Sequence, residues 1–206
     1  MLEDQPQYSD RREGRPQGKE QKYRARQRAR SLRVFKNYAI TIVVVAAAGW
    51  GIYFLSQGST PQGEDFSRAV PLMDTNHIEV GSSLPEYTSN PPTSGPHYVQ
   101  TARSGFREEV ISDQHLIHNL EHGDIWIAYH PSVSDEVREE LGQFTAAKVV
   151  VTPREANDND IALAAWGRLD TFDVENNVVP VERIKDFIKR YTNKGPEQVP
   201  GASGGV

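Results

Sequence analysis

The sequence predicts an α+β domain, in which helices pack on a small sheet in two layers, preceded by a single N-terminal transmembrane helix. Three observations predict it: an uncharged apolar run near the N-terminus, a reversal of net charge across that run, and an alternation of strand-like and helix-like segments in the second half. A length of 206 residues provides for one ordinary domain with extensions.

The apolar run covers residues 38–55 and contains no charged side chain. As a helix it would span roughly 27 Å, close to the hydrocarbon thickness of a bilayer. Residues 1–37 hold eleven Lys or Arg against five Asp or Glu, whereas the chain after residue 55 is strongly acidic. The positive-inside rule therefore places the N-terminus in the cytoplasm and the rest of the chain outside the membrane. Trp50, Tyr53 and Phe54 would lie at the outer interface.

A cleaved signal peptide is the competing interpretation, because Ala46-Ala47-Ala48 resembles a cleavage site. The segment before the apolar run is too long for that class, and the run continues past the alanines, so a retained signal anchor is favoured. Residues 1–37 have few apolar side chains and are expected to be a disordered basic tail. Its arginines would bind anionic lipid at the bilayer surface, and no nucleic acid is expected as a partner.

The folded extracytoplasmic domain is predicted at 65–195, between a linker at 56–64 and a flexible tail at 196–206. Its first half is rich in Pro, Ser and His and is expected to be irregular. In its second half, Ser134 can cap a helix with one apolar face. A last helix would begin near Val181 and end before Gly195-Pro196. The predicted strands are 125–129, 148–152 and 161–166.

The histidines are the clearest sign of chemistry, since all six lie between residues 77 and 130. On a helix, His118 and His122 are neighbours on one face, with His115 one turn earlier. A stiff Pro-rich loop, Asn90 to Pro96, delivers His97. The chain has no cysteine, so thiol redox chemistry is excluded and any metal site must use imidazoles and carboxylates.

The segments Pro-Pro-Thr-Ser-Gly-Pro-His at 91–97 and His-Asn-Leu-Glu-His-Gly at 118–123 resemble the bacterial family catalogued as domain of unknown function 3105. The resemblance extends over about residues 72–198. It implies no reaction, because the activity of that family is not established. It does imply a set of positions typical of the family, namely His77, Ser94, His97, His118, Glu121 and His122. His115 and His130 are not in this set.

Three functions are considered on these grounds. The favoured hypothesis is a protein that binds copper or zinc, with four imidazoles as ligands and three polar groups that orient them. The predicted ligands are His97, His118, His122 and His77, and the predicted orienting groups are Glu121, Ser94 and Asp124.

The second hypothesis is a non-catalytic module that docks on a membrane complex or on a component of the cell envelope. The third is a zinc hydrolase, because residues 118–122 fit the His-x-x-Glu-His pattern. The sequence offers that hydrolase no clear third ligand, and a strand follows the motif at once, so an enzymatic role is not favoured.

Overall fold

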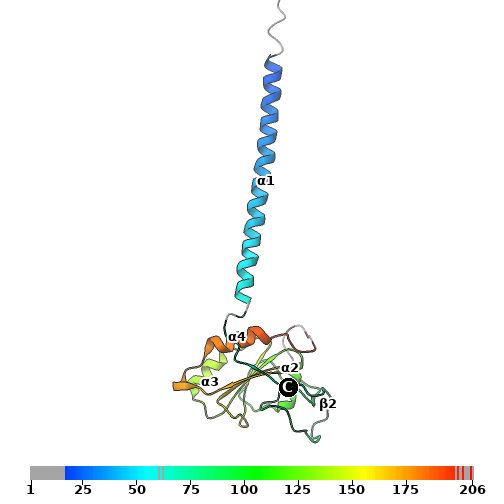
Figure 1. The fold of residues 1–206 in the computed structure, drawn as a ribbon, viewed down its shortest axis with the longest axis vertical. Coiled ribbons are helices and arrows are strands. Elements are labelled where there is room, and N and C mark those ends of the chain that lie inside the picture. Colours follow the sequence, from blue (N-terminus) through cyan, green and yellow to red (C-terminus); the bar gives the residue numbers. More distant parts are fainter. Residues whose placement is uncertain are drawn as a thin grey trace, which may run out of the picture. The chain divides into compact units, whose positions relative to one another are not determined.

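The computed structural model describes residues 17–59, 61, 63–197, 199, 201 and 205 (Figure 1). They form two units, the helix α1 and the domain that follows it, and each is described by itself. The helices are α1 (Gln17–Ser59), α2 (Asp113–Glu121), α3 (Asp135–Gly142), α4 (Val181–Tyr191) and the short 3-10 helix η1 (Glu175–Asn177). The strands are β1 (Arg68–Ala69), β2 (His77–Ile78), β3 (His97–Tyr98), β4 (Gly105–Phe106), β5 (Ile125–Tyr129), β6 (Val149–Pro153), β7 (Ile161–Ala165) and β8 (Arg168–Phe172).

Helix α1 contains a stretch that is long and apolar enough to cross a bilayer. The large apolar side chains of this stretch, such as Ile42, Val44 and Trp50, are exposed. The structure differs from the sequence-based expectation in that residues 17–37 continue the same helix, and so do residues 56–59 of the predicted linker. The physical reason is composition: Arg, Lys, Gln, Glu and Ala are all good helix formers, and they extend a helix already begun by the apolar run. Residues 1–16, and most of the predicted tail at 196–206, lie outside the described residues.

The α+β class of the domain is confirmed. A mixed sheet of six strands has the order β1-β8-β7-β5-β6-β4, and a separate pair is made by β2 and β3. Strand β5 is central, parallel to β6 and antiparallel to β7. Sequence reasoning missed β8, because Arg168 and Asp170 break its apolar pattern. Asp170 is nevertheless buried and forms a bidentate ion pair with Arg183 of α4.

Helices cover both faces of the sheet. Alternate residues of β5 point to opposite sides: Ile125, Ile127 and Tyr129 join a core with α3 and α4, while Trp126 and Ala128 join a second core with Leu116 and Leu120 of α2. Helix α2 therefore adds a layer to the two that the sequence predicts. This second core matters for function, because it holds one face of α2 on the sheet and leaves the opposite face for the histidines.

Candidate metal centre

Helix α2 positions His118 and Glu121 on one face, three residues apart. It ends at Glu121, where His122 is the C-cap residue and Gly123 takes a left-handed conformation with φ of 79°. The amide of Gly123 donates to Leu120 O at 2.9 Å, and that of Asp124 donates to Asn119 O at 2.9 Å. The chain thus turns directly from the helix into β5, which sets where the last turn of the helix lies.

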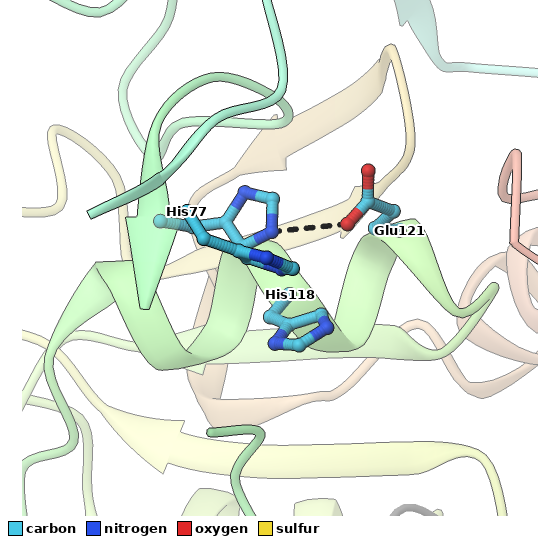
Figure 2. A group of neighbouring side chains, drawn as sticks. His77, His118 and Glu121 are labelled. Carbon is cyan, nitrogen blue, oxygen red and sulfur yellow. Dashed lines mark ion pairs between the residues drawn. The ribbon is translucent and has the colours of Figure 1, made fainter. Parts of the chain in front are cut away.

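The small parallel sheet supplies two further histidines. Strands β2 and β3 pair so that His77 lies beside His97, and the amide of His97 donates to Asn76 O at 3.0 Å. His97 is fully buried, whereas His77 is exposed. Figure 2 shows His118 and Glu121 on one helix and His77 reaching toward them from a neighbouring segment; the dashed line marks the contact between His97 and Glu121.

Four side chains converge in what we call the inner group: His77, His97, His118 and Glu121. Each offers one ligand atom, and these atoms all lie within 4.8 Å of one another. The ring centroids of the three imidazoles are 4.8–5.0 Å apart. In a tetrahedral zinc site, ligand atoms about 2.1 Å from the ion are separated by roughly 3.4 Å, so small side-chain movements would close this group around an ion.

Backbone carbonyls orient two of the rings. Nδ1 of His97 lies 2.8 Å from Gly95 O, and Nδ1 of His118 lies 2.8 Å from Tyr98 O. Because a carbonyl oxygen only accepts, each Nδ1 must carry the hydrogen, and Nε2 is left with the lone pair when the ring is neutral. A backbone acceptor behind an imidazole is the usual way in which a metal-binding histidine is held.

The surroundings keep His118 neutral. Burial lowers the pKa of His118 to about 4, helped by the neighbouring His122, His97 and His77 and opposed by the hydrogen bond to Tyr98 O. At neutral pH the ring therefore offers a lone pair to a cation and carries no charge of its own.

The contact between His97 and Glu121 is the most unusual feature of the inner group. Nε2 of His97 lies 3.0 Å from Oε2 of Glu121, and both side chains are buried. Within the part of the chain that the structure describes, this Nε2 has no hydrogen-bond partner. A buried carboxylate facing a buried lone pair is costly unless a positive charge is shared between them. A metal ion would supply that charge, and the residues present fit one.

A second set of ligand atoms, which we call the outer group, comprises His118, His122 and Glu197, again within 4.8 Å of one another. Nε2 of His122 lies 3.4 Å from Oε2 of Glu197. The rings of His118 and His122 are 4.5 Å apart. His118 therefore belongs to both groups.

His77, His97 and His118 lie together in the inner group, and His122 lies in the outer one. Glu121, expected to orient an imidazole, contributes its carboxylate to the inner group itself.

The other two predicted orienting groups, Ser94 and Asp124, hold neighbouring segments in place: Ser94 contacts the backbone before β2, and Asp124 contacts residues at the end of α2. The Ser94 hydroxyl accepts from the amide of Met73 at 3.0 Å. Asp124 accepts from Asn119 at 2.9 Å and pairs with Lys148 at 3.1 Å, and that Lys148 also donates to His122 O at 2.8 Å. Ser94 thus ties the His97 loop to the chain before β2, and Asp124 steadies the end of α2.

His115 and His130 belong to neither group as far as the described residues extend. The His115 ring contacts Gln100 O, and His130 contacts the hydroxyl of Ser132 at the end of β5. Sequence reasoning missed Glu197 as a candidate ligand. Glu197 follows the Gly195-Pro196 terminator directly and so falls in the predicted flexible tail at 196–206, whereas in the structure its amide donates to Glu121 O.

A family model described as "Protein of unknown function (DUF3105)" matches residues 77–203, more than half of the chain. The match begins at His77 and extends beyond Glu197, so it contains both groups. No match was found among curated proteins or among solved structures.

Proposed function

The chain belongs to this DUF3105 family, and we propose that its folded domain binds one copper or zinc ion through the inner group. The observation that carries the proposal is the buried contact between His97 Nε2 and Glu121 Oε2, completed by His118 and His77. Three imidazoles and one carboxylate, with no thiolate, are ligands that suit zinc and copper(II). The carbonyl-bound Nδ1 atoms of His97 and His118 hold these two rings oriented before an ion arrives.

We also propose that the site lies at a membrane surface. Helix α1 would anchor the domain in a bilayer, with the basic end in the cytoplasm and the metal centre outside. The exposed arginines between Arg24 and Arg30 would bind anionic lipid headgroups, each contributing about 1 kcal/mol near a negatively charged surface.

One feature of the site favours a zinc hydrolase, and another argues against it. Glu197 supplies a third ligand beside His118 and His122, which completes a set of the kind found in zinc hydrolases. Glu121, however, would have to act as a free general base, and its carboxylate lies against His97 in a buried position. Metal binding without hydrolysis is therefore the better-supported function.

The test uses the full chain purified in detergent, stripped with a chelator and titrated with zinc or copper(II). We expect one tight equivalent per chain, measured by elemental analysis and competition titration. Replacing His97→Gln or Glu121→Gln should weaken binding by more than about 100-fold, beyond the 10–100-fold loss typical of groups that merely support a ligand. His115→Gln is the matched control, because its ring also contacts a backbone carbonyl but belongs to neither group.

Wild-type protein without stoichiometric metal, or a His97→Gln variant that binds as tightly as wild type, would overturn the proposal. Either result would favour the docking module, which is then sought by crosslinking from the membrane. A chelator-sensitive turnover of peptide or ester substrates would instead favour the hydrolase. Circular dichroism of each variant checks that the domain is folded.

A further inference from the structure

We propose that the ion reaches the inner group by way of the outer group, with His118 as the ligand that it keeps throughout. This inference rests on the proposed metal binding, and it assigns a role to His122 and Glu197 that the inner group does not need. The chemical class of the cargo is a divalent transition-metal ion that accepts imidazole and carboxylate ligands.

Because of the hydrogen bond that His118 makes, the inner and outer groups cannot both hold an ion at the same time. Its Nδ1 is bound to Tyr98 O, so Nε2 is the one atom that it can offer to a metal. A single nitrogen lone pair binds one ion at a time. The His118 ring lies 4.8 Å from the His97 ring on one side and 4.5 Å from the His122 ring on the other. An ion on His118 can thus be completed by either set, but both sets cannot be filled together.

Exposure decreases from the outer group to the inner one. The side chain of Glu197 is 58% exposed and that of His122 is 16% exposed. The side chains of His97 and Glu121 are 1% and 7% exposed. A hydrated ion can therefore be captured by Glu197 and lose water in steps. His77, the one exposed member of the inner group, would close on the ion last.

The outer group is built by a segment that docks on the end of α2. The amide of Asn193 donates to Gly123 O at 2.8 Å, and the amide of Glu197 donates to Glu121 O at 3.0 Å. Gly195 lies so close to this turn that a Cβ atom would come 2.1 Å from Glu121 O. The backbone of the segment is thus bound to the same two residues, Glu121 and Gly123, that flank His122. Glu197 lies beside His122 because of this packing.

The transfer is a ligand exchange in which no electron moves. Bonds from the ion to a His122 nitrogen and a Glu197 oxygen break, and its bond to His118 Nε2 remains. Bonds to His97 Nε2, to a Glu121 oxygen and, in place of a bound water, to a His77 ring nitrogen form. Three imidazoles and a buried carboxylate replace two imidazoles and an exposed carboxylate. The buried carboxylate of Glu121 is poorly solvated without a cation, so a bound ion stabilises the inner group more than the outer group. This difference in binding free energy drives the ion from the outer group to the inner one.

The experiment measures stoichiometry and rates on the full chain in detergent. Zinc is mixed with metal-free protein in a stopped-flow instrument, and its release to an excess of a chromophoric chelator is then followed. For Glu197→Gln, and for Glu197→Gln combined with His122→Gln, we expect one bound ion with affinity within about 10-fold of wild type but loading and release slowed at least 10-fold. Glu182→Gln is the control, since that carboxylate is also exposed and lies on α4 away from both groups.

The outcomes separate this inference from the function on which it rests. Two zinc ions bound per wild-type chain, or loading of both variants at the wild-type rate, would overturn the exchange and leave metal binding intact; the second result would mean that ions enter past His77. Failure of the wild type to bind zinc or copper would overturn metal binding and the exchange with it. Because the Glu197 side chain is exposed, Glu197→Gln keeps the test valid even where the double variant misfolds.

Discussion

Among the residues that the structure describes, His118 is the one that belongs to both the inner and the outer group. Its ring is buried, its Nδ1 is bound to a carbonyl, and its neighbours are three other imidazoles. Burial and these neighbours lower its pKa to about 4, whereas an unfolded histidine titrates near 6.5. The residue therefore couples the protonation of the centre to the stability of the fold.

The first prediction concerns pH. Between pH 6.5 and pH 4 the unfolded chain takes up a proton at residue 118 that the folded chain does not, so the free energy of unfolding falls as the pH is lowered. From pH 7 to pH 5 the metal-free protein should lose on the order of 1–2 kcal/mol through His118. Urea denaturation at both pH values in the presence of a chelator measures the loss.

His118→Gln should remove most of that pH-dependent loss, and His115→Gln should retain it. The groups that face His118 are His77 and His97 from the small sheet and His122 from the end of its own helix, so their charge states contribute to the same curve. An unchanged pH-dependent loss in His118→Gln would contradict the assignment to this residue.

At the scale of elements, the outer group depends on how the segment after α4 meets the end of α2. Gly123 and Gly195 allow the two backbones to approach: a Cβ atom at Gly123 would lie 2.7 Å from Asn193 Cα, and one at Gly195 would lie 2.1 Å from Glu121 O. The two backbones thus meet with no room for a side chain at either glycine.

The second prediction is that Gly195→Ala forces this segment away from α2. The clash is with backbone atoms, which cannot rotate aside, so we expect a loss of about 1–3 kcal/mol in unfolding free energy. Zinc loading should slow as in Glu197→Gln, because Glu197 is displaced from His122.

Gly142→Ala is the matched control. At that position the nearest atom to a new Cβ is a side-chain atom of Phe106 at 3.8 Å, which is an ordinary van der Waals distance. The free energy of unfolding should therefore change by less than about 1 kcal/mol. Equal effects of the two substitutions in chemical denaturation would argue against a packing role specific to Gly195.

Several elements could be predicted because their cause is local. Ser134 caps α3 by accepting from the amide of Val137, and the apolar face of that helix repeats at helical spacing. Strand β8 could not be predicted, since its buried Asp170 is acceptable only with Arg183 opposite, and Arg183 comes from α4. The extension of α1 through residues 17–37 does not follow from apolarity, because this segment has few apolar side chains; its Arg, Lys, Gln and Ala residues nevertheless favour a helix.

At the scale of the whole molecule, the chain has a basic end, an apolar helix and an acidic domain. The third prediction concerns the orientation that this charge pattern favours. In membranes of a bacterial host, Ser83→Cys should react with a membrane-impermeant maleimide in intact cells, and Gln27→Cys only after permeabilisation. Both positions are exposed, and the natural chain has no cysteine to give a background signal.

The cysteine-free wild type is the control for this labelling. Reaction of Gln27→Cys in intact cells would reverse the orientation, and release of the labelled Ser83→Cys domain from membranes by salt would indicate that the helix is cleaved or is not an anchor.

The sequence by itself determined the features that depend on neighbouring residues or on composition: the apolar span, the charge reversal, the α+β class, the capped helix and the concentration of histidines. It also paired His118 with His122, because four residues of helix suffice to bring them together.

Only the tertiary structure decided which histidine meets which partner. His77 and His97 lie side by side through a two-residue parallel pairing, and Glu121 joins the inner group because His97 faces it across the site. Glu197, far along the chain, reaches His122 because two glycines allow the backbones to touch. Such contacts join residues distant in sequence, and spacing along the chain carries no information about them.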